Sequence, residues 1–104
     1  MVLYVMQWNV HPDKTDAYME WSKGAIARTV SAPGVVEFRA YRPATGTSQA
    51  VITYEFANMA AWETWQAHQD VQDVVTELRT LANNVSSELW GPSPVVPDPI
   101  RPGA

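Results

Sequence analysis

The order of strand-like and helix-like segments is the feature that most constrains how this chain folds. Runs of β-branched and aromatic residues predict four strands, over residues 2–10, 35–43, 49–56 and 85–91. Helical spacing of apolar residues predicts a helix over 15–31 and a longer helical region from 58 to 84. Because crossovers between such strands are right-handed, this order gives one four-stranded antiparallel sheet with the helices on one face.

Short polar residues mark where the helices begin and divide. Asp13 or Thr15 can cap the first helix, and Asn58 can cap the second helical region. Gln69 and Asp70 interrupt the apolar pattern of that region, so it can divide there into two helices.

Alternation along the strands assigns side chains to the two faces of the sheet. The apolar set should pack under the helices: Val2, Tyr4, Met6, Trp8, Val36, Phe38, Ala40, Ala50, Ile52, Tyr54 and Phe56. A sheet with helices over one face only is the ferredoxin-like α+β arrangement.

The opposite face of the sheet mixes apolar and polar residues: Leu3, Val5, Gln7, Asn9, Val35, Glu37, Arg39, Tyr41, Val51, Thr53 and Glu55. It is too apolar to be left in water and too polar for an ordinary core. A second copy of the sheet would cover it, with Arg39 between Glu37 and Glu55. The pattern therefore predicts a homodimer that pairs through its sheet faces.

Composition excludes several classes of function. The net charge is −4 and the seven basic residues are scattered, which argues against nucleic-acid binding. The chain has no cysteine, and its two histidines are far apart in sequence, so we expect no metal site. The first ten residues carry no basic leader and are too short to span a bilayer, so we expect a cytoplasmic protein without a membrane partner.

Residues 2 to 90 resemble a known family. The strand order, the Tyr54-Glu55-Phe56 strand end and the Ala-rich helix with a ring in its second turn resemble the antibiotic biosynthesis monooxygenase (ABM) domain. That resemblance implies a dimeric α+β barrel. It divides the chain into a domain over 1–91 and a tail over 92–104, which holds five of the eight prolines.

Two branches of that family carry residues that can be compared with this chain. The heme-degrading branch implies roles for Asn9 and Trp65, but Val75 stands where its iron-binding histidine would be, so we expect no heme. The branch that oxidises anthrones to quinones without a cofactor has Asn-Tyr-x-x-Trp on the third strand, which is missing here. Many of its members have a histidine where Trp65 stands, and His68 lies one turn further on.

A cavity between helices and sheet is the candidate site. Trp62 and Trp65 lie three residues apart on a helix, so they either belong to the core or line such a cavity. In the second case the substrate-binding walls would be Trp8, Trp21, Tyr54 and Trp62, with Trp65, His68 and Asn9 as catalytic candidates. An imidazole can accept a proton from a phenol or enol near neutral pH, which makes His68 the candidate base.

Two functions of different classes follow from these residues. One is a cofactor-independent monooxygenase that acts on a small aromatic or polyketide-like substrate, which activates oxygen itself once deprotonated. The alternative is a non-catalytic dimeric module that binds a small molecule or responds to stress. An enclosed, partly polar cavity favours the enzyme, and a fully packed interior favours the module.

Overall fold

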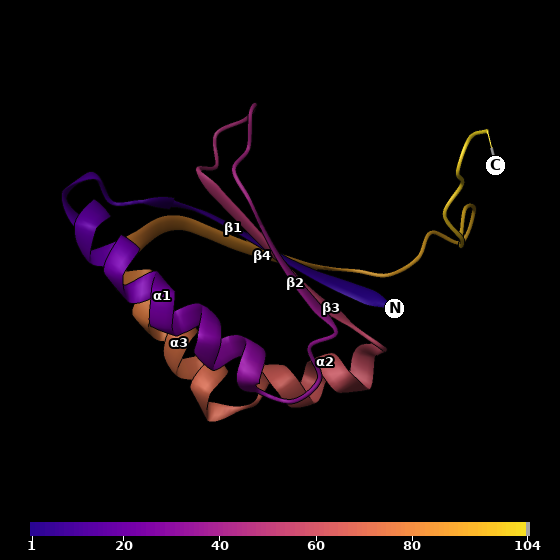
Figure 1. Cartoon of the computed structure of the whole chain (residues 1–104), viewed down its shortest axis with the longest axis horizontal. Helices are drawn as coiled ribbons and strands as arrows, with labels where there is room; N and C mark the ends of the chain where they lie inside the picture. Colours follow the sequence, from indigo (N-terminus) through magenta and orange to yellow (C-terminus); the bar gives the residue numbers. More distant parts are fainter. Residues whose placement is uncertain (104) are drawn as a thin grey trace.

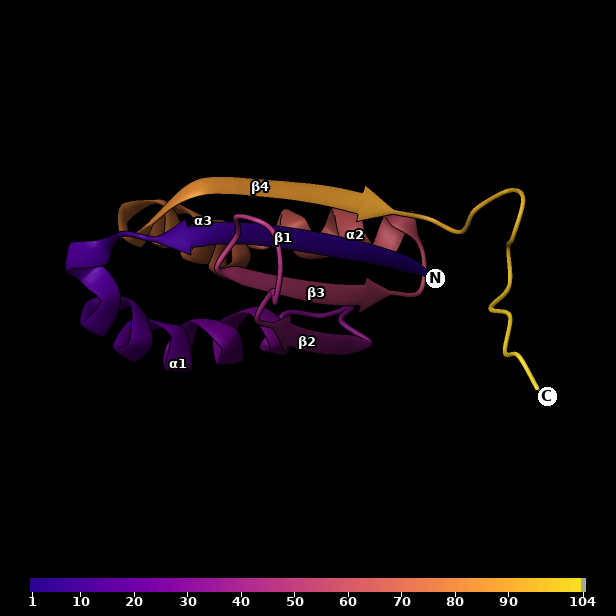
Figure 2. The same cartoon turned by 90° about the horizontal axis from the view of Figure 1, so that it is seen from above.

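The structure is a computed structural model that describes residues 1–103, and it confirms the predicted ferredoxin-like fold. All three α-helices lie on one side of a four-stranded antiparallel sheet (Figure 1). The strands lie in the order β2-β3-β1-β4, as Figure 2 shows from above. The elements are β1 (Val2–Val10), a 3-10 turn (Pro12–Lys14), α1 (Thr15–Ser31), β2 (Glu37–Tyr41), β3 (Ala50–Phe56), α2 (Met59–Gln66), α3 (Gln69–Leu81) and β4 (Ala82–Trp90).

The register of the two central strands places their rings on the helix side. Tyr4 pairs with Tyr54, and Trp8 pairs with Ala50. The core between sheet and helices is centred on Phe56 and Trp65, which are 0% and 2% exposed. The prediction from strand alternation is therefore confirmed for the two central strands.

The edge strands differ from the prediction. β2 is shorter than residues 35–43, and Val36, expected in the core, precedes it and is 56% exposed. Ala40 is exposed as well, because β2 is an edge strand that the helices cover less completely. β4 begins at Ala82, three residues earlier than the predicted 85–91, so Asn83 and Asn84 lie in the strand and do not end the helix.

An irregularity in the pairing of β1 with β4 accompanies this early start. The register shifts between Gln7 and Asn9, and Asn84 has a φ of 52°. Asparagine adopts this left-handed conformation more readily than most residues, since its side chain bonds locally to the backbone. The positive φ of Asn84 thus accompanies the register shift near the start of β4, which follows α3 without a loop.

The polar residues that were expected to cap or divide the helices mark the helix boundaries only in part. The Asn58 side chain caps α2 by accepting a hydrogen bond from the amide of Ala61 at 2.9 Å, as predicted. The second helical region does divide, at Ala67 and His68, slightly earlier than expected. Neither Asp13 nor Thr15 caps α1, because the 3-10 turn leads directly into that helix.

The helix-free face of the sheet keeps its mixed character. Val5 and Thr53 are paired at its centre and are already buried within one chain. In the part of the chain that the structure describes, Arg39 pairs with Glu37 and not with Glu55. No helix within residues 1–103 is long and apolar enough to cross a membrane.

The segment after β4 runs away from the sheet in both views (Figures 1 and 2). Val95 is 86% exposed and Ile100 is 75% exposed. These side chains add nothing to the core formed by the helices and the sheet. The division into a domain over 1–91 and a tail is a prediction that this extended path agrees with.

The two phenylalanines provide a matched test of the core. Phe56→Ala should lower the free energy of unfolding by about 3–5 kcal/mol, because it removes a ring that is completely buried between sheet and helices. Phe38→Ala removes the same atoms from a half-buried position on the edge strand and should cost only about 1–2 kcal/mol. Urea unfolding measures both values, and equal losses would contradict this assignment of the core.

Candidate functional site

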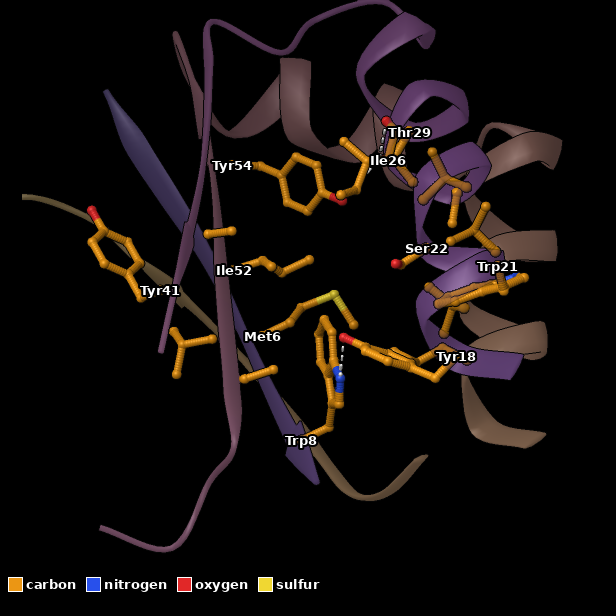
Figure 3. Close-up of a pocket in the computed structure, with 18 of the residues that line it drawn as sticks. Met6, Trp8, Tyr18, Trp21, Ser22, Ile26, Thr29, Tyr41, Ile52 and Tyr54 are labelled. Atoms are coloured by element: carbon orange, nitrogen blue, oxygen red, sulfur yellow. Dashed lines mark hydrogen bonds between the residues drawn. The ribbon is translucent and has the colours of Figure 1, made fainter. Parts of the chain in front are cut away.

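A cavity of about 250 Å³ lies between α1, α3 and the inner face of the sheet. Figure 3 shows side chains from both layers pointing into it. β1 and β3 contribute mainly large apolar groups, and α1 contributes residues one turn apart, from Tyr18 to Thr29. The interior is therefore neither fully packed nor strongly polar.

Four of the aromatic residues expected from the sequence line this cavity. They are Trp8, Trp21, Tyr54 and Trp65. Each indole N–H of these residues has a partner: Trp8 donates to the Tyr18 hydroxyl, Trp21 to Glu77 and Trp65 to the Thr29 carbonyl. The rings are thereby fixed in orientation, and their faces and edges form the wall.

Trp62 lies elsewhere. Its ring packs against Tyr4 with centroids 5.6 Å apart, and it does not line the cavity. Its buried indole N–H has no partner within residues 1–103. The reason is geometric, because Trp65 faces the centre of the core while Trp62, three residues earlier, contacts the β1 side.

His68 is not among the residues that line the cavity. It is the N-cap of α3, where its Nδ1 accepts a hydrogen bond from the Asp70 amide at 3.2 Å, and it is exposed. His68 was expected one turn after Trp65 on the same helix, with a possible break only at Gln69 and Asp70, whereas α2 already ends at Gln66. Its action as a base stays a prediction that this position does not support.

Asn9 lies near the end of β1, outside the cavity lining. Its Oδ1 accepts a hydrogen bond from the Gln49 amide at 2.8 Å, and the Gln49 side chain accepts one from the amide of Val10. These bonds tie the end of β1 to the start of β3. The structure therefore gives Asn9 a contact between strand ends and does not include it in the cavity lining with Trp65.

Tyr18 is a site residue that the sequence analysis did not single out. Its hydroxyl accepts the Trp8 N–H at 3.1 Å inside the cavity wall (Figure 3). Burial raises the pKa of the Tyr18 hydroxyl, and the hydrogen bond from Trp8 offsets this in part. The available signal was the spacing of Tyr18, Ser22 and Thr29, which places three hydroxyl side chains along one side of α1.

Tyr54 is the second phenol in the wall. It donates to the Thr29 hydroxyl at 2.9 Å, and burial raises the pKa of Tyr54 to about 12. Both phenols therefore stay protonated at neutral pH.

No carboxylate, imidazole, ammonium or guanidinium group belongs to the cavity lining in the described chain. Within residues 1–103, no three His, Asp or Glu side chains gather in a way that could hold a metal ion. Val75, at the position of the family's iron ligand, contributes an aliphatic side chain to the wall. The arrangement is suited to a flat, largely apolar, uncharged ligand with a polar atom near Tyr18.

Comparisons with known proteins agree with this fold. The family model described as antibiotic biosynthesis monooxygenase matches residues 1–77. No curated protein matches the sequence.

Solved structures with this fold are similar over most of their length. SnoaB, a cofactor-independent oxygenase from Streptomyces nogalater, is 20% identical, with 93% of this chain and 97% of that one covered at a TM-score of 0.70. A DABB family protein from Mesorhizobium loti is 16% identical, with 88% of this chain and 96% of that one covered at a TM-score of 0.79. A dimeric ferredoxin-like protein of unknown function from Thermobifida fusca is 11% identical, with 86% of this chain and 88% of that one covered at a TM-score of 0.72. At these identities the likeness establishes the fold alone.

His68→Ala separates the two roles open to this histidine. We expect the free energy of unfolding to fall by about 1 kcal/mol, because the N-cap of α3 is lost. We expect turnover of an identified substrate to change little, since the ring lies outside the cavity lining. Asn58→Ala is the matched control, because it removes the cap of α2 in the same way. A hundredfold loss of turnover in folded His68→Ala alone would reinstate His68 as the base.

Proposed function

This chain belongs to the antibiotic biosynthesis monooxygenase family, and on that basis we propose that it oxidises a small phenolic aromatic compound with O2, without a cofactor. The observation that carries the proposal is the cavity between α1 and the sheet, with indole and phenol rings in its walls. A flat electron-rich ring fits between such walls by stacking and edge contacts. SnoaB, a cofactor-independent oxygenase with the same fold, adds support.

The chemistry requires little from the protein. The phenol loses its hydroxyl proton, and the resulting anion, whose charge spreads onto a ring carbon, transfers one electron to O2. The two radicals combine into a peroxide at that carbon, and loss of water leaves a carbonyl. The ring carbon changes from C–H to C=O, and the two hydrogens lost are that one and the hydroxyl hydrogen. O2 supplies the carbonyl oxygen and the oxygen of the released water. The proton passes to water at the open side of the cavity, because no basic side chain lines the walls.

That lack of a lining base also favours a second candidate function. The same cavity would bind an aromatic ligand without changing it, and the protein would then act as a binding module. Both candidates require the cavity, and only the first consumes oxygen.

We further propose that the chain forms a homodimer through the helix-free face of its sheet. The centre of this face is formed by Val5 and Thr53, with Leu3 and Val51 half-buried beside them. Trp90 and Tyr41 lie on strands β4 and β2 at the edges of the sheet and are each 50% exposed. Contiguous apolar surface of this kind is costly to leave in water, and an identical face would cover it.

Oxygen uptake tests the enzymatic proposal. With a dihydroxynaphthalene whose hydroxyls are meta to one another, we expect the protein to consume O2 and to form a hydroxynaphthoquinone, a product with one more oxygen and two fewer hydrogens. An oxygen electrode and mass spectrometry measure both. Ala25→Phe, which fills the cavity from α1, should abolish the reaction, whereas Ala27→Phe on the exposed side of α1 should not. Binding without oxygen uptake would identify the protein as a binding module.

Sedimentation equilibrium tests the dimer. Thr53→Glu places a charge at the centre of the helix-free face and should convert a micromolar dimer into a monomer. Thr64→Glu makes the same substitution on the exposed surface of α2 and should leave the dimer intact. A wild-type protein that sediments as a monomer would contradict the proposal.

A further inference from the structure

The side-chain donors of the cavity wall are almost all committed to partners within the protein. The three lining indoles donate to Tyr18, Glu77 and Thr29 as described above. Ser22 donates to the Met19 carbonyl at 3.0 Å, and Thr29 donates to the Ile26 carbonyl at 3.0 Å. Tyr54 donates to the Thr29 hydroxyl. None of these groups retains a proton for a ligand.

Tyr18 is the exception. Its oxygen accepts from Trp8, but within residues 1–103 no acceptor takes its own proton. The hydroxyl of Tyr41, the remaining phenol of the lining, points away from the cavity (Figure 3). A buried or half-buried hydroxyl normally finds an acceptor, so the Tyr18 proton is available to a ligand oxygen.

Ser22 complements this donor. It lies one turn after Tyr18 on α1, and Figure 3 shows its oxygen directed toward the cavity. Because its proton is used on the Met19 carbonyl, its oxygen is left as an acceptor. The two residues thus offer one donor and one acceptor on the same side of α1, the pair that a hydroxyl group requires.

The size of the cavity limits the ring system. A cavity of about 150 Å³ with apolar walls holds one benzene molecule. This cavity is about 250 Å³, so it has room for a second fused ring.

We propose that Tyr18 is a catalytic residue that donates a hydrogen bond to the hydroxyl oxygen of a two-ring phenol, while Ser22 accepts a hydrogen bond from the same hydroxyl group. This inference rests on the proposed function and specifies the substrate class and the residue that recognises it. As the phenol ionises, its proton leaves to water and the Tyr18 hydrogen bond strengthens, because a charged oxygen is the better acceptor. Trp8 holds the Tyr18 oxygen in place, so the donor is already oriented before the ligand binds.

Binding of α-naphthol and naphthalene to wild-type protein and Tyr18→Phe tests the inference. The quenching of tryptophan fluorescence reports both affinities. In wild-type protein α-naphthol should bind at least as tightly as naphthalene, although its hydroxyl is costly to remove from water. In Tyr18→Phe the affinity for α-naphthol should fall by about tenfold, the size of one hydrogen bond, and that for naphthalene should be unchanged. Tyr41→Phe is the matched control and should alter neither affinity.

Turnover separates this inference from the proposed function. If oxygen is consumed, Tyr18→Phe should lower kcat by about a hundredfold, because one donor to the developing anion is lost. If no oxygen is consumed but Tyr18→Phe still weakens α-naphthol binding about tenfold and leaves naphthalene binding unchanged, the proposed function fails and the binding site stands. Equal α-naphthol affinity and equal turnover in wild-type protein and Tyr18→Phe would overturn the inference.

The inference can be tested even if Tyr18→Phe does not fold. In that case the wild-type comparison decides, and weaker binding of α-naphthol than of naphthalene would overturn the inference.

Discussion

The packing of the molecule depends on Thr29, a buried residue of α1 to which two other elements bind. Its carbonyl accepts the indole N–H of Trp65 from α2, and its hydroxyl accepts the phenol of Tyr54 from β3. Trp65 in turn contacts the rings of Tyr54 and Phe56 with centroids 4.6 Å and 5.1 Å apart. Because buried donors are costly to leave unpaired, these bonds fix how α1 lies over the sheet.

The cavity follows from how α1 is held at both ends. At the Thr29 end the rings of Trp65 and Tyr54 fill the space between α1 and the sheet. Toward the other end Trp8 bonds to Tyr18, and Trp21 bonds to Glu77 of α3. Between these attachments α1 presents small residues, Ser22 and Ala25, toward the sheet, so the middle of the interface is left hollow. The hollow is thus a consequence of side-chain size along one helix.

The sequence predicted the fold better than it predicted the site. Strand alternation placed Tyr4, Trp8 and Tyr54 on the correct face, because a period of two is set by local geometry. His68 was assigned to the face of Trp65 because helical spacing was carried across residue 67, where the chain turns. The pattern did indicate a break at Gln69 and Asp70, but it did not show that α2 ends at Gln66, before His68. Tyr18 was missed for a related reason, since its free proton emerges only after every other donor has been assigned a partner.

Aromatic residues serve both the core and the candidate site here, and hydrogen bonding separates the two uses. Trp65 and Tyr54 both donate their hydrogen bonds to Thr29, so they contribute only the shape of their rings to the cavity. The Tyr18 hydroxyl only accepts a hydrogen bond, from Trp8, so its own proton remains available to a ligand. Since no charged group lines this wall in the described part of the chain, the position of that single proton has a large effect on which ligand orientation is favoured. The selectivity of such a site therefore depends on which donors have no hydrogen-bond acceptor within the protein.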